Sequence, residues 1–204
     1  MTETTSLLSH GQRRVFRLSE IAKRLFDVIM SFLGLLLLVP VFIWLAWLVR
    51  RDTPGPVFYR GERVGRRGKI FKILKFRTMH EDASSYAGPR LTASGDERIT
   101  PVGKWLRDTK LNELPQLWNV LKGDMSLVGP RPEDPSIAKT WKKEYAIEVL
   151  SIRPGITSPA AVLYRDEEQQ LFSSDPMGKY LREIQPSKQR LDQLYVRNRT
   201  FWTD

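Results

Sequence analysis

The clearest pattern along the chain is one long apolar run near its start. Residues 28–49 form 22 consecutive positions without a charged side chain. A helix of that length reaches about 33 Å, enough to cross the hydrocarbon core of a bilayer. Trp44 and Trp47 lie near the end of the run, where membrane interfaces favour tryptophan. A cleaved signal peptide fits poorly, because the run is long, starts late and lacks a small-residue cleavage site before Arg50.

Two features favour a segment that enters the membrane and returns over one that crosses it. Pro40 lies near the middle, removes a helix hydrogen bond and predicts a kink. Both flanks are basic, and a spanning helix can place only one of them on the cytoplasmic side. A re-entrant hairpin broken at Pro40 is therefore favoured, with a simple span and a buried core helix as the alternatives. The basic residues are Arg13, Arg14, Arg17, Lys23 and Arg24 before the run and Arg50, Arg51, Arg60 and Arg63 after it.

Around this run the chain predicts three segments. Residues 1–18 are polar and basic and are expected to form an N-terminal arm. Ser19, with Glu20 behind it, suits the N-cap of a membrane helix over residues 19–51. Residues 52–204 then form a single domain. The pattern of this domain predicts an α/β class that is mostly helical, with one small β-hairpin.

The elements of the domain follow from the spacing of its apolar residues. Two β-prone runs, residues 57–60 and 69–79, are separated by glycine-spaced basic residues, which predicts the hairpin. Period-3.6 spacing predicts amphipathic helices at four places. These helices cover residues 98–109, 112–122, 135–152 and 186–202.

The helix over residues 112–122 has a well-marked start and end. If Asn112 is its N-cap, Pro115 falls in the first turn, where a missing N–H has no consequence, and Gly123 ends the helix. Asn112 then has a purely structural explanation. It also has a functional one, because a helix N-terminus attracts anions, and adjacent side chains such as Glu113 point there at a bound phosphate or metal. The residues alone leave both explanations open.

Composition narrows the chemistry. The chain has no cysteine and only two histidines, His10 and His80. A thiolate metal site is thereby excluded, and a histidine-rich zinc site or a Ser-His-Asp triad is disfavoured. The net charge of +10 implies an anionic partner: nucleic acid, a phospholipid surface or a phosphorylated substrate. No basic recognition helix or RNA-binding signature is present, so nucleic acid is not expected as a partner.

Three arginines lie beside turns rather than along a helix face. They are Arg107, Arg131 between Pro130 and Pro132, and Arg165 after a Pro-Gly turn. Guanidinium groups bind phosphate oxygens bidentately and stay charged, so a diphosphate substrate would need several of them. Any one of them alone is more often a surface ion pair. Together with a neighbouring glutamate and a membrane anchor, they suggest phosphoryl chemistry on a lipid.

Several longer stretches carry a family resemblance. They include "FKILKFRTM", "RPGIT" and the block from Arg98 to Glu133, "RITPVGKWLRDTKLNELPQLWNVLKGDMSLVGPRPE". Through these stretches, and from "KRLFDV" to "RNRTFW", the chain resembles the bacterial sugar transferases known as monotopic phosphoglycosyl transferases. In that family the re-entrant helix breaks at a proline, and Pro40 holds the matching position.

The resemblance implies an activity and its partners. A sugar phosphate would pass from a UDP-sugar to polyprenyl (undecaprenyl) phosphate with release of UMP, the initiating step of bacterial glycan assembly for a polysaccharide, O-antigen or glycoprotein. The place implied is the cytoplasmic face of the bacterial inner (plasma) membrane, with residues 52–204 as the catalytic domain. The implied partners are the UDP-sugar, the polyprenyl phosphate and the phospholipid membrane, and a homo-oligomer is left open.

The resemblance also assigns roles to residues. Family members use an adjacent Asp–Glu pair with Mg²⁺. The Asp attacks the sugar-bearing phosphorus to form a covalent phosphosugar-enzyme species, and the Glu assists the metal and the reacting groups. The pair falls at Asn112 and Glu113 of this chain, which become the implied catalytic and Mg²⁺-binding residues. The other implied site residues are the catalytic Arg107 and, at the substrate, Pro130, Arg131, Pro132 and Arg165.

Asn112 is where the chain departs from the family pattern. An amide is neutral and a far weaker nucleophile than a carboxylate, so covalent catalysis through Asn112 is not expected. Asn is nearly isosteric with Asp, so the fold and the pocket should survive. The departure predicts an impaired form of the enzyme. The alternative is a non-catalytic membrane scaffold that binds nucleotide sugar or lipid phosphate, although the retained Glu113 and arginines argue against complete loss of the site.

Overall fold

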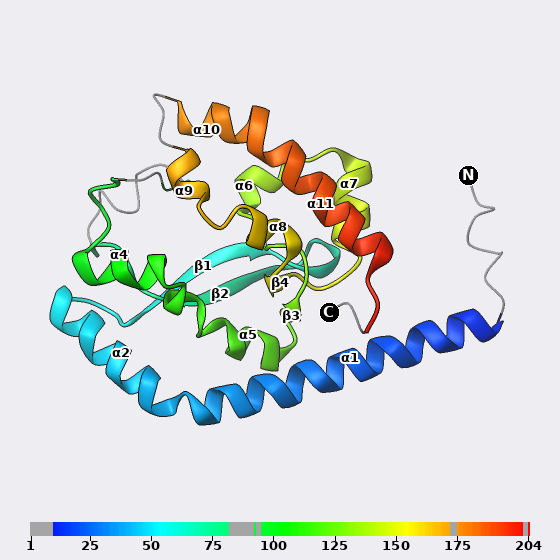
Figure 1. Ribbon diagram of the computed structural model, residues 1–204, viewed down its shortest axis with the longest axis horizontal. Coiled ribbons are helices and arrows are strands. Elements are labelled where there is room, and N and C mark those ends of the chain that lie inside the picture. The colour runs from blue at the N-terminus through cyan, green and yellow to red at the C-terminus, as the bar shows by residue number, and fades with distance from the viewer. Residues whose placement is uncertain (1–9, 82–91, 93–94, 172–174, 202–203) are drawn as a thin grey trace.

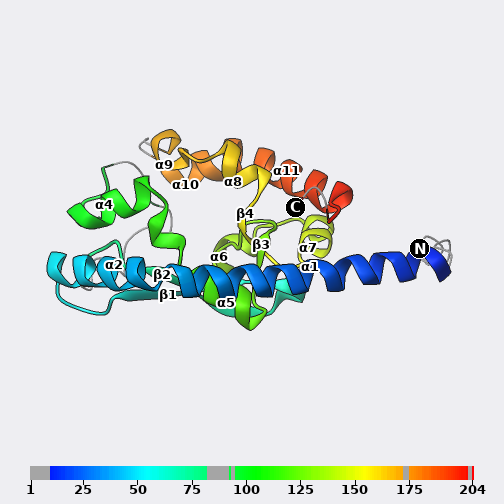
Figure 2. The same ribbon diagram turned by 60° about the horizontal axis from the view of Figure 1, so that its bottom comes forward.

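Helices α1 (His10–Leu37) and α2 (Val39–Asp52) run along one side of the molecule, and the rest of the chain lies on their other side (Figure 1, Figure 2). The structure is a computed structural model that describes residues 10–81, 92, 95–171, 175–201 and 204. Helix α5 (Gln116–Lys122) packs on α1, and α4 (Pro101–Asp108) packs on α2. The helix pair is therefore a layer of its own with the domain resting against it.

The two helices meet at a sharp bend. Leu38 separates them, and their axes differ in direction by 63°. Pro40 is in the first turn of α2, where it cannot donate a hydrogen bond to the preceding helix, and its ring displaces the carbonyl one turn back. The kink predicted from Pro40 is thus confirmed. In the described part of the chain no single helix is long and apolar enough to cross a bilayer, and only this bent pair meets both conditions.

The expected start of the first helix is wrong. Helix α1 begins at His10 and runs through Ser19, so Ser19 is not an N-cap. Residues 10–18 contain no proline and several good helix formers, which lets the helix extend backward from its apolar part. The latter half of the arm expected over residues 1–18 is therefore helical, and residues 1–9 lie outside the described part of the chain.

The predicted hairpin is confirmed. Strands β1 (Phe58–Val64) and β2 (Ile70–Phe76) are antiparallel, with Phe58 opposite Phe76 and Val64 opposite Ile70. A short 3-10 turn, η1 (Arg66–Gly68), joins them, and both Arg67 and Gly68 have positive φ there. Period-2 alternation along β2 turns Phe71 and Ile73 toward the domain.

A second, unpredicted sheet holds the "GPRP" and "RPGIT" motifs together. Strands β3 (Ser126–Val128) and β4 (Gly155–Thr157) are parallel. A Cβ on Gly155, the first residue of β4, would lie 2.1 Å from the backbone nitrogen of Gly129 just after β3, so only glycine allows this approach. Three-residue strands are too short to show an alternating pattern, which is why the sequence did not reveal them.

The remaining elements of the described residues are helices, so this part of the chain is mostly helical with two small sheets. The helix predicted over residues 135–152 is two helices, because the chain turns around Trp141 between them. The helix predicted over residues 186–202 ends at Asn198 and continues backward through a π-helical turn. These elements are η2 (Leu111–Glu113), α6 (Pro135–Ala138), α7 (Lys143–Val149), α8 (Pro159–Leu163), α9 (Glu167–Gln170), α10 (Pro176–Lys179), η3 (Tyr180–Ile184) and α11 (Gln185–Asn198).

The bent helix pair shares its core with the domain. Leu45 and Val49 of α2 are buried in one cluster with Phe76 of β2 and Leu106 of α4. Burying a large aliphatic or aromatic side chain contributes about 1.5–3 kcal/mol. The α2 helix is therefore a structural part of the domain as well as an apolar segment.

Polar groups fix α1 to the same domain. Asp27 is 2% exposed, and its Oδ2 accepts a hydrogen bond from Ser126 Oγ at 2.7 Å. Arg24 donates to the carbonyls of Val120 and Leu121 at 2.8 and 3.2 Å, which satisfies the last turn of α5. The opposite side of the helix pair exposes large apolar side chains: Ile21, Leu25, Phe26, Ile29, Phe32 and Leu36 on α1, and Ile43, Trp44 and Trp47 on α2.

Candidate active site

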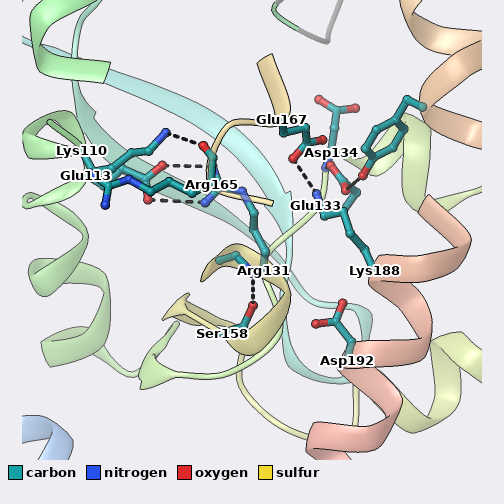
Figure 3. A network of polar contacts seen from close by, with 12 residues as sticks. Lys110, Glu113, Arg131, Glu133, Asp134, Ser158, Arg165, Glu167, Lys188 and Asp192 are labelled. Carbon is teal, nitrogen blue, oxygen red and sulfur yellow. Dashed lines mark hydrogen bonds and ion pairs between the residues drawn. The ribbon is translucent and has the colours of Figure 1, made fainter. Parts of the chain in front are cut away.

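The candidate site centres on Glu113, at the end of the short turn η2 between α4 and α5. Arg131 approaches both of its carboxylate oxygens, with Nη2 at 3.0 Å from Oε1 and Nη1 at 3.4 Å from Oε2. Lys75 Nζ of β2 donates to Oε1 at 2.9 Å. Figure 3 shows the Glu113 and Arg131 side chains meeting across the gap between η2 and the "GPRP" segment. The glutamate side chain is only 14% exposed.

These contacts set the charges of the three groups. Burial alone would raise the pKa of Glu113, but Arg131 and Lys75 outweigh it and hold the pKa well below its usual range. The Glu113 charge in turn raises the pKa of Arg131. Burial, with the charge of Arg131, lowers the pKa of Lys75 to about 8 despite the opposing effect of Glu113. Glu113 is therefore an ionised carboxylate in contact with two cationic side chains.

Asn112 is placed differently from the N-cap expected for it. Helix α5 begins four residues later, at Gln116, and Lys110 with φ of 60° starts the η2 turn instead. The i→i+3 hydrogen bonds continue across the turn, from Glu113 N to Lys110 O and from Leu114 N to Leu111 O, so Asn112 lies inside it. Asn112 is 7% exposed, and its Oδ1 has no hydrogen-bond partner among the described residues.

The predicted arginines take three different positions. Arg131 lies on Glu113. Arg165 is exposed, and its backbone carbonyl accepts a hydrogen bond from Lys110 Nζ at 3.1 Å, which brings it beside η2 (Figure 3). Arg107, in the last turn of α4, donates to Thr78 Oγ1 at 3.2 Å. The structure thus joins Arg131 directly to Glu113 and carries Arg165 to its edge, while Arg107 contacts the end of the hairpin.

Pro130 and Pro132 restrict the backbone around Arg131. Both prolines are buried, and the carbonyl of Pro130 accepts a hydrogen bond from Gly155 N at 2.9 Å. A proline has a fixed φ, so the two rings restrict the backbone on either side of Arg131. Their contribution is therefore to hold the guanidinium in place through the β3–β4 junction.

Lys75 is a site residue that the sequence reading missed. Its signal was present in the strand alternation, because Phe71, Ile73 and Lys75 share one face of β2 and the first two are buried. Asn119 of α5 fixes this strand: its Oδ1 accepts from Leu74 N, and its Nδ2 donates to Lys72 O, each at 2.9 Å. The Asn119 amide makes the backbone hydrogen bonds that a neighbouring strand would make with β2, and so fixes β2 beside Glu113.

The site is built on the bent helix pair. Leu111 and Leu114, on either side of Asn112 and Glu113, pack against the cluster that contains Leu45 and Val49 of α2. The rings of Trp44 and Trp105 also meet edge to face, with centroids 5.9 Å apart. The turn that carries the candidate catalytic pair is therefore packed directly on α2.

The oxygen groups present fit Mg²⁺ bound together with a phosphorylated substrate. The described residues hold no group of three or more His, Asp or Glu side chains that could bind a metal on its own. Mg²⁺ commonly takes one or two carboxylates and completes its shell with substrate phosphates and water. Glu113 supplies an ionised carboxylate, and the unpartnered Asn112 Oδ1 supplies a second oxygen beside it.

Comparison with known proteins covers nearly the whole chain. The family described as "Bacterial sugar transferase" matches residues 18–204. A Bacillus subtilis (strain 168) protein, whose name provisionally describes an undecaprenyl-phosphate N-acetylgalactosaminyl 1-phosphate transferase, is 43% identical over 60% of this chain and 68% of its own length.

Two longer relatives match more of this chain. The UDP-N-acetylgalactosamine-undecaprenyl-phosphate N-acetylgalactosaminephosphotransferase of Aeromonas hydrophila is 33% identical over 89% of this chain and 40% of its own length. The undecaprenyl-phosphate galactose phosphotransferase of Salmonella typhimurium is 36% identical over 92% of this chain and 39% of its own length. The chain therefore spans less than half of these two relatives. Because the family match extends from residue 18 in α1 to residue 204, the protein belongs to the bacterial sugar transferase family.

Proposed function

We propose that this protein transfers a sugar phosphate from a UDP-sugar to undecaprenyl phosphate, releasing UMP and starting the assembly of a bacterial glycan. The observation that carries the proposal is Glu113, a buried, ionised carboxylate gripped by Arg131 and Lys75 on a turn that packs against an apolar helix pair. A lipid phosphate and a nucleotide diphosphate would meet at such a place. Relatives named for N-acetylgalactosamine phosphate and galactose phosphate transfer support the same reaction class.

The substrate phosphates are proposed to bind over Glu113. Arg131 presents a bidentate guanidinium, and Lys75 adds a second cation at Oε1 of the carboxylate. Arg165 and Lys110 extend the positive charge along the exposed edge of the turn. Arg107 is proposed to reach the leaving nucleotide from the end of α4. These cations would neutralise charge on the diphosphate while it is attacked.

Glu113, with Asn112 Oδ1 beside it, would hold Mg²⁺. When bound, the ion would withdraw charge from the phosphoryl oxygens. The protein residues would meanwhile orient the diphosphate and keep Glu113 deprotonated. Removing divalent ions should accordingly weaken nucleotide-sugar binding as well as turnover.

We further propose the location and division of the chain. The bent pair over residues 19–51 would insert into the cytoplasmic leaflet of the inner membrane as a re-entrant anchor, with its exposed apolar side in lipid. Residues 52–204 would form the catalytic domain on the cytoplasmic face. Packing of α2 against η2 would then hold the site at the height of the lipid phosphate.

Asn112 determines whether the chain turns over through a covalent intermediate. In Asn112→Asp the new carboxylate would stand beside Glu113, with Arg131 and Mg²⁺ to keep it ionised. It could attack the sugar-bearing phosphorus, so that a P–O bond to the carboxylate forms while the bond to UMP breaks. We expect Asn112→Asp to raise UMP release strongly in the presence of Mg²⁺, and a sugar-phosphate adduct to appear when undecaprenyl phosphate is withheld.

The experiment incubates both forms, reconstituted in membranes, with a panel of UDP-sugars and records UMP release and intact protein mass. Glu113→Gln added to Asn112→Asp should abolish the gain, because the metal-binding carboxylate is then neutral. The second candidate function, a non-catalytic scaffold that binds nucleotide sugar, is favoured by the neutral Asn112 alone. If neither form releases UMP or gains mass with any sugar in the panel, the scaffold becomes the better reading.

A further inference from the structure

A second group of cations lies in a shallow pocket between α1 and the tip of the β1–β2 hairpin. Five basic side chains line it: Lys23, Arg24, Arg66, Arg153 and Arg199. The hairpin tip and Lys75 are at opposite ends of β2, about 17 Å apart at the usual rise of a strand. This pocket is thus separate from the site around Glu113.

The carboxylates in the pocket are already paired. Asp27 accepts from Lys23 Nζ and from Ser126 Oγ, each at 2.7 Å. Glu20 accepts from Arg199 Nη2 at 2.5 Å. Within the described residues, neither Arg66 nor Arg153 has a carboxylate within ion-pair distance. Among the same residues Arg24 also lacks an ion pair, but both of its terminal nitrogens already donate to carbonyls of α5. Arg66 and Arg153 therefore have no direct carboxylate partner, although Glu20 acts on both at longer range and Asp27 acts on Arg153.

These two arginines are nonetheless held in place. Arg66 Nε donates to the carbonyl of Ser151 and Arg153 Nε to the carbonyl of Gly123, each at 2.9 Å. Their terminal nitrogens remain available, since each guanidinium has five N–H donors. Burial lowers the pKa of Arg66, and the charge of Arg153 lowers it further, so the two groups lie close enough to repel each other. Both stay protonated at neutral pH.

The pocket lies at the height expected for lipid headgroups. It borders α1 at residues 20–27, the two turns immediately before the apolar run that starts at residue 28. On the other side of the helix at the same height, Ile21 and Leu25 are 65% and 59% exposed. An apolar chain could thus lie along α1 while a charged group reaches the pocket.

We propose that Arg66 and Arg153 bind the phosphate of an anionic phospholipid headgroup, whose acyl chains lie along the exposed face of α1. Guanidinium groups fixed by backbone carbonyls would accept the phosphodiester without rearrangement, and the lipid would remove their mutual repulsion. The site is independent of sugar-phosphate transfer, so this proposal and the proposed function can fail separately. It would orient the bent helix pair by tethering α1 at the membrane surface, just before its apolar part.

The test titrates the full chain, purified in a nonionic detergent, with dihexanoylphosphatidylglycerol and separately with dihexanoylphosphatidylcholine. Native mass spectrometry records the lipid that stays bound. We expect the anionic lipid to be retained preferentially, and Arg66→Gln and Arg153→Gln each to weaken its binding by roughly tenfold, the size of one charge-assisted hydrogen-bonded contact. Arg66→Lys keeps the charge but loses the planar guanidinium. Its lipid affinity should lie between that of the unaltered protein and that of Arg66→Gln.

The matched control is the double variant Lys142→Gln, Lys143→Gln. It removes two exposed cations at the start of α7, outside the pocket, and should leave binding unchanged. Equal losses in the control would show non-specific attraction to the basic surface and overturn the proposal. Displacement of the lipid by an equal concentration of inorganic phosphate would assign the pocket to a soluble anion and also overturn it. Because Arg153 supports the end of α5, Arg66→Gln decides the outcome if Arg153→Gln shifts the unfolding temperature.

Discussion

At the scale of single residues, Lys75 should give substrate binding an upper pH limit. Burial lowers the pKa of Lys75 to about 8, so the side chain is charged below that pH and neutral above it. Loss of this charge removes one of the two cations on Glu113. We expect UDP-sugar affinity to fall as pH rises through about 8, whereas Lys75→Arg, which stays protonated, should keep its affinity. Calorimetric titrations across this range measure both forms, and an identical fall in the variant would contradict the assignment.

Arg131 should be sensitive even to a conservative change. Arg131→Lys cannot approach both oxygens of Glu113 as the guanidinium does. The expected loss of UDP-sugar binding is about 1–2 kcal/mol, at the lower end for a charged contact because the Arg131 side chain is 38% exposed. Arg182→Lys, whose ion pair with Asp175 lies on the surface, is the matched control and should have no effect.

The assignment of the phosphate site would be wrong if three alanine substitutions each left UDP-sugar binding and turnover unchanged. The substitutions are Arg107→Ala, Arg131→Ala and Arg165→Ala.

Residue types in this site could be predicted from sequence, but their surroundings could not. Glu113 and Arg131 were expected together, and they form an ion pair. Asn112 was expected at a helix boundary because asparagine is a good cap, yet the i→i+3 bonds of η2 place it inside a turn with its Oδ1 buried. Lys75 was not expected in the site. Its role depends on a contact across 38 positions of the chain, which local patterns do not encode.

At the scale of elements, the contact between α7 and α11 contains a carboxylate that should destabilise the protein. Asp192 is 6% exposed, and its Oδ1 has no partner among the described residues, while its Oδ2 accepts from Tyr145 Oη at 3.1 Å. Burial raises the pKa of Asp192 from 3.8 to about 6, against the opposing effects of Tyr145 and Lys188. Ionisation therefore costs the folded state stability above pH 6, and this cost disappears as pH falls toward 3.8.

Asp192→Asn should remove that cost while keeping an oxygen for Tyr145. We expect the variant to be more stable by about 1–3 kcal/mol at neutral pH, with the gain shrinking at pH values near 4. Unfolding in detergent at the two pH values measures the difference. Tyr145→Phe is a useful companion, because it leaves Asp192 without its remaining donor and should be destabilising. A gain for Asp192→Asn that is equal at both pH values would rule out ionisation as its cause.

Prediction of the elements succeeded where periodicity was sustained and failed where tertiary contacts decide. The hairpin, α4 and the end of α5 at Gly123 were expected from sequence and are present. Helices α6 and α7 were expected as one, because residues around Trp141 keep a helical pattern while the backbone turns. The parallel β3–β4 pair joins segments about thirty positions apart and leaves no local signal.

At the scale of the whole molecule, the bend between α1 and α2 limits how deeply the pair can enter a bilayer. Each apolar arm has ten or eleven residues and is about 15 Å long, too short to cross a hydrocarbon core of about 30 Å. With the 63° bend shared equally, each arm descends only about 8 Å below the membrane surface. The apolar run would then lie within one leaflet, with both basic flanks on the same side.

This geometry predicts the topology of the chain. Single cysteines at Ser6 and Lys142, in a protein that has none, should both be protected from an impermeant thiol reagent in intact cells and both react after lysis. Pro40→Leu would restore the missing backbone donor and favour a straight helix of about 33 Å, long enough to span. We expect the variant to expose the Ser6→Cys site to the reagent. Combined with Asn112→Asp, it should also abolish the UMP release gained by that change, since straightening moves Leu45 and Val49 away from the residues beside Glu113. Labelling of only one site in the unaltered chain would establish a spanning helix and contradict the re-entrant anchor.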